Sequence, residues 1–116
     1  MTMTEIGNLM DKGKFSRRPR YSVVFHDVRE KLELSTNTYI VVDSIHKLST
    51  SNRHFPYCVM SKEALADFLK LGRATVFRSI KEAEEAGLIE REAGRGLRST
   101  QKWIDAVEMY RIDADE

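Results

Sequence analysis

The chain has 116 residues, of which 41% are hydrophobic and 32% are charged, with 19 Lys and Arg against 18 Asp and Glu. This length suits a single domain with a modest core, and the composition excludes a disordered chain, while the absence of a run of about 18 apolar residues argues against a membrane span. The formal net charge of +1 argues against a nucleic-acid partner, but a total says nothing of how the charges are ordered.

Residues 1–20 are expected to form a flexible basic tail, because they show little hydrophobic periodicity. Over residues 11–20 five cations accompany a single acid, Asp11. A solvated terminus is the ordinary interpretation of such a segment. The alternative is a basic arm that lies along a phosphate backbone or in a minor groove, formed by Arg17, Arg18 and Arg20.

The folded domain is expected over residues 21–112, with an acidic tail at 113–116. Residues 21–25 suit a short extended piece, and His26–Leu34 suits a turn or brief helix that leads to Ser35. A serine hydroxyl can accept from backbone N–H groups two or three residues on, so Ser35 is a good N-cap. The apolar residues that then recur at three-residue steps are Tyr39, Val42, Ile45 and Leu48. They favour a helix over Thr36–Leu48, although the β-branched residues 40–42 would also suit a strand.

A polar break at residues 49–52 precedes a short extended stretch, Phe55–Met60. Ser61 then caps a second helix, which is expected to end near Lys70 because Gly72 readily takes a positive φ. Apolar spacing predicts a third helix over Arg73–Ala86, closed by Gly87.

Beyond this helix, Leu88–Glu92 alternates as a strand does, and Gly94–Ser99 is a glycine-rich turn or loop. Trp103–Ile112 is ambiguous. Trp103, Val107 and Tyr110 fit one helical face. As in a strand, however, Val107, Met109 and Arg111 alternate with Glu108, Tyr110 and Ile112.

The third predicted helix carries an ordered charge distribution. If Val76 and Ile80 face inward, the outward residues are Arg73, Ala74, Phe77, Arg78 and Lys81. Lys70–Lys81 holds four cations and no acid, Glu82–Glu92 has a net charge of −4, and Arg95–Lys102 holds three cations. Such blocks are typical of a helix whose first half enters a major groove while a following loop grips phosphate.

The stretch ALADFLKLGRATVFRSIKEAEEAGLIER resembles the winged helix-turn-helix family in its small-residue helix, glycine-containing turn, Thr-Val-x-Arg and Gly-Leu-Ile exit. With Leu34-Ser35, the Tyr39 helix and a strand at Phe55–Met60, it is similar to N-terminal domains of phage and plasmid replication proteins and to small bacterial regulators. The resemblance implies a mainly α fold with a small antiparallel β-sheet (α+β). It places a wing at Gly94–Thr100, between Leu88–Glu92 and a closing strand near Ala106–Ile112. Residues 101–105 depart from the family, whose wing usually returns directly into its closing strand.

The function expected is double-stranded DNA binding, in a transcriptional regulator of a bacterial or phage-infected cytoplasm. Arg73 and Arg78 are predicted to contact bases. Phe77 is expected either to pack on the neighbouring strand or wing or to touch a thymine methyl. Thr75 and Ser79 are expected to hydrogen-bond phosphate, and Thr75 could equally cap or stabilise the start of the helix. The predicted DNA-binding residues are Arg73, Thr75, Phe77, Arg78, Lys81, Arg95, Arg98 and Lys102, of which Lys81 and the last three bind phosphate.

Two alternatives remain open. One is an origin-binding domain of a phage or plasmid replication initiator. The other is a protein-interaction module without DNA binding, which docks through Phe77 and the aromatic C-terminus. A homodimer on a two-fold site is compatible with either DNA-binding role, and Trp103–Ile112 would supply its interface if it is helical.

No enzyme, metal, cofactor or small-molecule ligand is expected. The sequence holds no CxxC or HxxxH pair and no evident Ser/His/Asp grouping, and Gly94–Gly96 is too short for a phosphate-cradling loop. Cys58 is expected to be a small core residue, and a lone cysteine fits a reducing cytoplasm. The N-terminus lacks the apolar stretch of a secretory signal, so export by that route is not expected.

Overall fold

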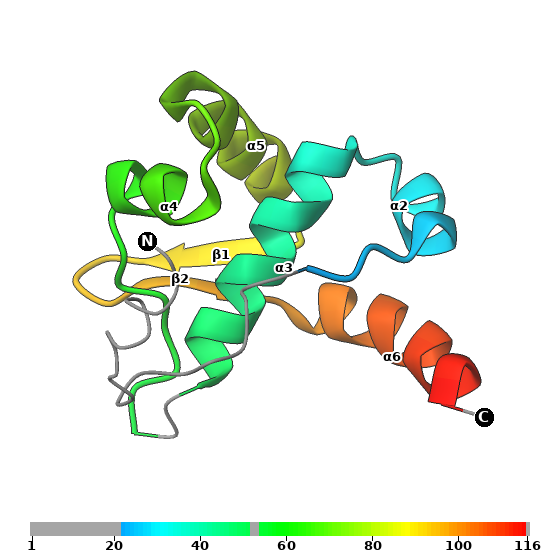
Figure 1. The fold of residues 1–116 in the computed structure, drawn as a ribbon. Helices are drawn as coiled ribbons and strands as arrows, with labels where there is room; N and C mark the ends of the chain where they lie inside the picture. The colour runs from blue at the N-terminus through cyan, green and yellow to red at the C-terminus, as the bar shows by residue number, and fades with distance from the viewer. Residues whose placement is uncertain (1–21, 52–53, 116) are drawn as a thin grey trace, which may run out of the picture.

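The computed structural model describes residues 22–51 and 54–115, drawn in colour in Figure 1. The basic-arm residues Arg17, Arg18 and Arg20 lie outside the described residues. The helices are α2 (His26–Lys31), α3 (Thr36–Thr50), α4 (Lys62–Leu69), α5 (Arg73–Glu85) and α6 (Gln101–Asp115), and the strands are β1 (Ile89–Glu92) and β2 (Gly96–Ser99). The two strands form an antiparallel sheet. The mainly α fold with a small antiparallel sheet is therefore confirmed, and no described helix is long and apolar enough to cross a membrane.

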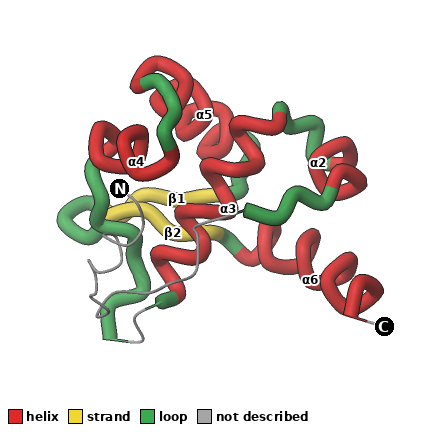
Figure 2. The backbone as a smooth tube through the Cα atoms, in the orientation of Figure 1, coloured by secondary structure: helices red, strands yellow, loops and turns green. Residues whose placement is uncertain are grey.

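Helix α3 is the central element of the fold (Figure 2). It begins where the sequence predicts, because the Ser35 hydroxyl accepts from the backbone N–H of Thr38 at 3.2 Å. It continues two residues beyond Leu48, to Thr50. The β-branched pair Val41 and Val42 is fully buried on this helix, where α3 packs against α5 and β2. Local propensity alone allowed a strand at residues 40–42, and burial in the tertiary structure selects the helix.

The turn between α4 and α5 corrects one prediction. Lys70, not Gly72, takes the left-handed conformation, with φ of 60°. Gly72 has φ of −66° and is the N-cap of α5. The reversal falls at Lys70 because the next residue, Leu71, turns back to pack against the core, and its N–H reaches the carbonyl of Ala66 at 3.0 Å. This bond satisfies a carbonyl at the end of α4 and offsets the cost of a left-handed lysine.

The hairpin also differs from expectation. Residues 96–99, which were expected to lie in a loop, form β2, which pairs with β1 so that Glu90 faces Arg98 and Arg91 faces Leu97. The closing strand expected near Ala106–Ile112 is wrong, because that segment belongs to α6.

Helix α6 includes a segment, residues 103–112, whose sequence fits both the period of a helix and that of a strand. Trp103 and Val107, four residues apart on one helical face, are both buried, so the 3.6-residue period prevails. The Trp103 ring packs edge-on against Tyr39 of α3, with ring centroids 5.0 Å apart and an interplanar angle of 63°. Trp103 and Tyr39 are 0% and 1% exposed, so α6 closes the core beneath α3, beside α2.

The expected strand at Phe55–Met60 is reduced to one bridge. Cys58 N–H donates to the carbonyl of Leu97 at 2.6 Å, and Leu97 N–H donates to the carbonyl of Cys58 at 3.1 Å. Cys58 is 2% exposed, so its prediction as a core residue is confirmed. The bridge fixes the segment before α4 to the edge of the hairpin.

Candidate nucleic-acid interface

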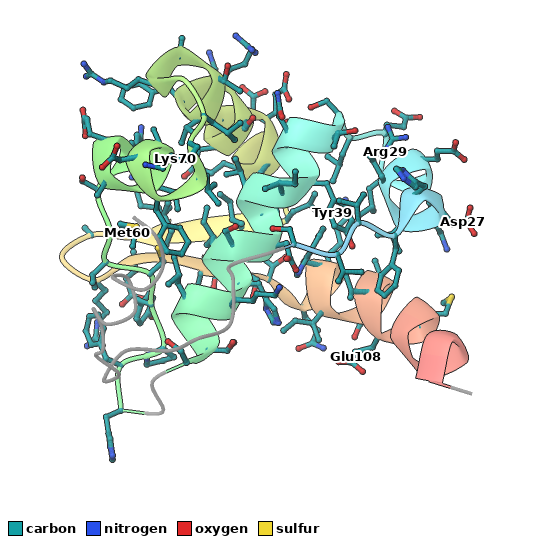
Figure 3. All side chains as sticks on the ribbon, in the orientation of Figure 1. Asp27, Arg29, Tyr39, Met60, Lys70 and Glu108 are labelled. Carbon is teal, nitrogen blue, oxygen red and sulfur yellow. The ribbon has the colours of Figure 1, made fainter. Side chains whose placement is uncertain are left out.

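Helix α5 presents the outward face that its sequence predicts. Val76 and Ile80 are buried, whereas Phe77, Arg78 and Lys81 are exposed. Arg73 and Ala74 in the first turn are also exposed. Figure 3 shows α5 at the edge of the molecule, with its outer side chains pointing away from α3.

The hydroxyls of α5 divide between surface and core. Thr75 is half-buried near the start of the helix. Ser79 is only 3% exposed, and its Oγ lies 3.3 Å from Thr38 Oγ1 in the α3–α5 contact. Phosphate binding by Ser79 is therefore wrong, because the interhelical contact encloses the hydroxyl. The Thr38 hydroxyl also donates to Glu82 at 2.8 Å, so this cluster joins α5 to the start of α3.

The first turn of α5 is braced against α4. Arg73 Nη2 donates to Glu63 Oε2 at 3.1 Å. The Phe77 ring, 36% exposed, has the Arg73 guanidinium 5.7 Å and the Lys62 ammonium 5.1 Å from its centroid. Phe77 thus lies between cations of α4 and α5, with ring and charges held in cation–π geometry.

Arg78 and Lys81 have no salt bridge among the described residues. The acids that follow them on α5 are partly engaged elsewhere: Glu82 accepts from Thr38, and Glu84 accepts from Arg91 at 3.2 Å. Two adjacent cations are therefore available to a ligand on the outer face of α5.

The arginines of the hairpin are differently placed. Arg95 Nε lies 3.3 Å from Glu92 Oε2, and Arg98 Nε donates to Glu90 Oε2 at 2.6 Å. Both guanidinium groups also lie over the Tyr57 ring, 5.8 Å and 5.1 Å from its centroid. The hydrogen bond to Glu90 raises the pKa of Arg98 above its ordinary value. The predicted phosphate-binding arginines are thus ion-paired within the hairpin.

Tyr57 ties this cluster to the body of the protein. Its hydroxyl donates to Glu92 Oε1 at 2.6 Å, and its side chain is buried. The pKa of Tyr57 is raised, chiefly by that hydrogen bond and then by burial. The carboxylate of Glu92 is therefore held by the Tyr57 hydroxyl at one oxygen and paired with Arg95 at the other.

Lys102 is not brought together with the other predicted phosphate-binding residues of the hairpin. It lies in the first turn of α6, past the end of β2 that is remote from the turn carrying Arg95. Its ammonium donates to the carbonyl of Ala86 at 2.8 Å, which satisfies a carbonyl at the end of α5. Lys102 therefore serves the junction of α5 and α6.

A groove of about 440 Å³ separates the hairpin turn from the start of α4. Three cations line it, Lys62, Arg91 and Arg95, together with Glu92 and the exposed side chain of Val59. In Figure 1 the hairpin turn and α4 lie on the same side of α3. This groove and Lys62 of α4, which sequence reasoning missed, extend the basic surface of α5 toward the hairpin.

Over the described part of the chain, no group of three or more His, Cys, Asp or Glu side chains could hold a metal ion. The site is a charged surface with a groove between the hairpin turn and the start of α4. Searches against protein-family models, curated proteins and solved structures find no match to this chain.

Proposed function

We propose that this chain is a winged helix-turn-helix protein that binds double-stranded DNA, with α5 in the major groove and the β1–β2 hairpin as the wing. The order of elements supports the proposal: α3, then α4 and α5 joined by a short turn, then an antiparallel hairpin. Transcriptional regulation in a bacterial or phage-infected cytoplasm is the role we propose for it.

The observation that carries the proposal is the pair Arg78 and Lys81. Both are exposed on the outer face of a 13-residue helix, and neither has a carboxylate partner among the residues described. A major groove about 12 Å wide admits one α-helix, and an arginine there pairs with the O6 and N7 of guanine. Arg78 is proposed to contact a base and Lys81 a phosphate.

Arg73 and its neighbours complete the face. One ion pair with Glu63 leaves other N–H donors of Arg73 for a base edge, since a guanidinium carries five. The exposed edge of Phe77 can contact a thymine methyl, and Thr75 can donate to phosphate at the start of the helix. Lys102 is left out of the proposed contacts because its ammonium caps α5.

Selection of bound duplexes from a random pool tests this function, followed by anisotropy titration of the recovered duplex. Arg78→Ala is expected to weaken binding by roughly tenfold or more, because a bidentate base contact is worth about 1–3 kcal/mol. Lys81→Ala should weaken binding to all duplexes alike and lower the slope of log K against log salt by about 0.9.

Lys31→Ala is the matched control, because it removes the same charge from an exposed position on α2, on the other side of α3. It should change the affinity little. If no duplex is enriched, or if Lys31→Ala weakens binding as much as Lys81→Ala, the proposed function fails. A chain that docks proteins through Phe77 instead would enrich no duplex.

A further inference from the structure

The hairpin carries its own counter-charges in fixed positions. Glu90 and Arg98 are directly opposite each other in the β1–β2 register, and their side chains meet at 2.6 Å. Glu92 and Arg95 meet at 3.3 Å across the turn. Arg98 and Arg95, the two hairpin residues predicted to bind phosphate, are therefore each paired with a carboxylate of β1.

These pairs are held more firmly than isolated surface ion pairs. Glu92 also accepts a hydrogen bond from Tyr57, which is 7% exposed and adjoins the Cys58–Leu97 bridge. Both guanidinium groups lie over the Tyr57 ring. The two carboxylates, the two arginines and Tyr57 thus form one cluster of contacts, whose geometry is set by the fold.

When DNA approaches, its phosphates compete with these carboxylates for the two arginines. A phosphate that approaches Arg95 or Arg98 competes with a carboxylate for the guanidinium, and that carboxylate repels the same DNA backbone. Each phosphate contact that does not form removes about 0.9 from the slope of log K against log salt. Because all four side chains are about half exposed, the exchange remains accessible to a backbone held in place by other contacts.

We propose that Glu90 and Glu92 are specificity-determining residues that suppress binding of the hairpin to DNA of arbitrary sequence. The inference rests on the DNA-binding function proposed above. At a correct site, α5 holds the duplex in register, and Arg98 and Arg95 exchange their carboxylates for phosphates. At an incorrect site, the ion pairs Arg95–Glu92 and Arg98–Glu90 remain formed, and the two arginines bind no phosphate.

The test compares Glu90→Gln, Glu92→Gln and the double variant on two duplexes, the selected sequence and a scrambled sequence of equal length. Glutamine keeps the shape of the side chain and an oxygen for Tyr57, but removes the charge. The double variant should bind the scrambled duplex about tenfold or more tightly, with a salt slope steeper by about 1.8, from two added phosphate contacts. The ratio of affinities for selected over scrambled duplex should fall.

Glu108→Gln on α6 is the matched control, since it makes the same charge change at an exposed position (Figure 3). It should alter both duplexes equally and leave the ratio unchanged. A second comparison uses Arg98→Ala, which should weaken scrambled-duplex binding little in the natural chain and about tenfold in the Glu90→Gln background. This coupling measures the competition directly.

The outcomes separate the two proposals. If the natural chain binds the selected duplex but the glutamine variants match Glu108→Gln in affinity, slope and ratio, the role of the carboxylates is refuted while DNA binding stands. If the natural chain binds neither duplex, the proposed function and this inference fall together. Should the double variant unfold, Glu90→Gln alone carries the test, because it leaves the Tyr57–Glu92 hydrogen bond intact.

Discussion

Gly96→Ala tests how the hairpin is fixed to the body of the protein. Gly96 begins β2 with φ of 131°, a conformation that L side chains rarely adopt, and a Cβ there would overlap the carbonyl oxygen of Cys58. That oxygen accepts the bridge hydrogen bond from Leu97. An alanine therefore strains its own backbone and also forces the bridge segment away from β2.

The expected loss of unfolding free energy in Gly96→Ala is the sum of these contributions. Backbone strain at such a φ costs about 1–3 kcal/mol. Loss of the two Cys58–Leu97 hydrogen bonds adds about 0.5–1.5 kcal/mol each. The expected fall in the free energy of unfolding is about 4 kcal/mol, a large share of the roughly 5–15 kcal/mol of an ordinary domain.

Gly94→Ala is the matched control. Gly94 also has a positive φ, of 80°, but no atom lies within 4 Å of the position of its Cβ. Only backbone strain applies, so a loss of about 1–2 kcal/mol is expected. Urea unfolding followed by the fluorescence of Trp103, the single tryptophan, measures both variants. Equal losses for the two alanines, or a Gly96→Ala protein as stable as the natural chain, would refute the role given to the bridge.

Three further predictions concern buried groups. Thr38→Val should lower the free energy of unfolding by about 1–3 kcal/mol in urea melts, because it leaves Ser79 and Glu82 without their hydroxyl partner. Thr38→Ser keeps the hydroxyl and should therefore retain most of the stability of the natural chain. The pKa of Tyr57 lies above its ordinary value, so its contribution to stability is present below the ordinary tyrosine pKa and is lost as the pH rises through the folded-state value. NMR titration of the ring, assigned with Tyr57→Phe, should show that the pKa of Tyr57 falls in Glu92→Ala, which removes the acceptor; no fall would exclude the hydrogen bond as the cause of the raised pKa. Burial raises the pKa of the Cys58 thiol, so a thiol reagent should modify it slowly in the native protein and quickly in denaturant, and equal rates would contradict the packing.

Local rules predicted the helices well where capping residues precede periodic apolar runs. Ser35 and Ser61 each accept from the backbone N–H three residues on, and α3 and α4 begin directly after them. The third predicted helix is matched by α5 to within one residue at its end. These features depend on neighbours in sequence, so the sequence alone suffices for them.

The elements that were predicted wrongly depend on partners far along the chain. Residues 96–99 contain a glycine and an arginine and look like a loop until they are paired with β1. Residues 103–112 fit both a strand and a helix, and burial of Trp103 against Tyr39 decides between them. Neither pairing can be deduced from spacing within the segment itself.

The candidate site divides in the same way. Exposure of Arg78 and Lys81 follows from helical periodicity and was predicted correctly. The pairing of Arg98 was not predicted, because it depends on the register that sets Glu90 opposite it. Counting charges by segment placed the acids of β1 and Arg98 of β2 in separate blocks, yet antiparallel pairing brings Glu90 and Arg98 into contact.

DNA reading by α5 is tested most directly by NMR mapping of the surface that contacts DNA, with amide shifts followed as the selected duplex is added. Shifts are expected to concentrate on α5 over residues 73–81 and on the hairpin turn, whereas α2 and the exposed face of α6 should change little. Shifts confined to α2 and α6, or no saturable shifts at any residue, would contradict the assignment of α5 as the helix that reads DNA.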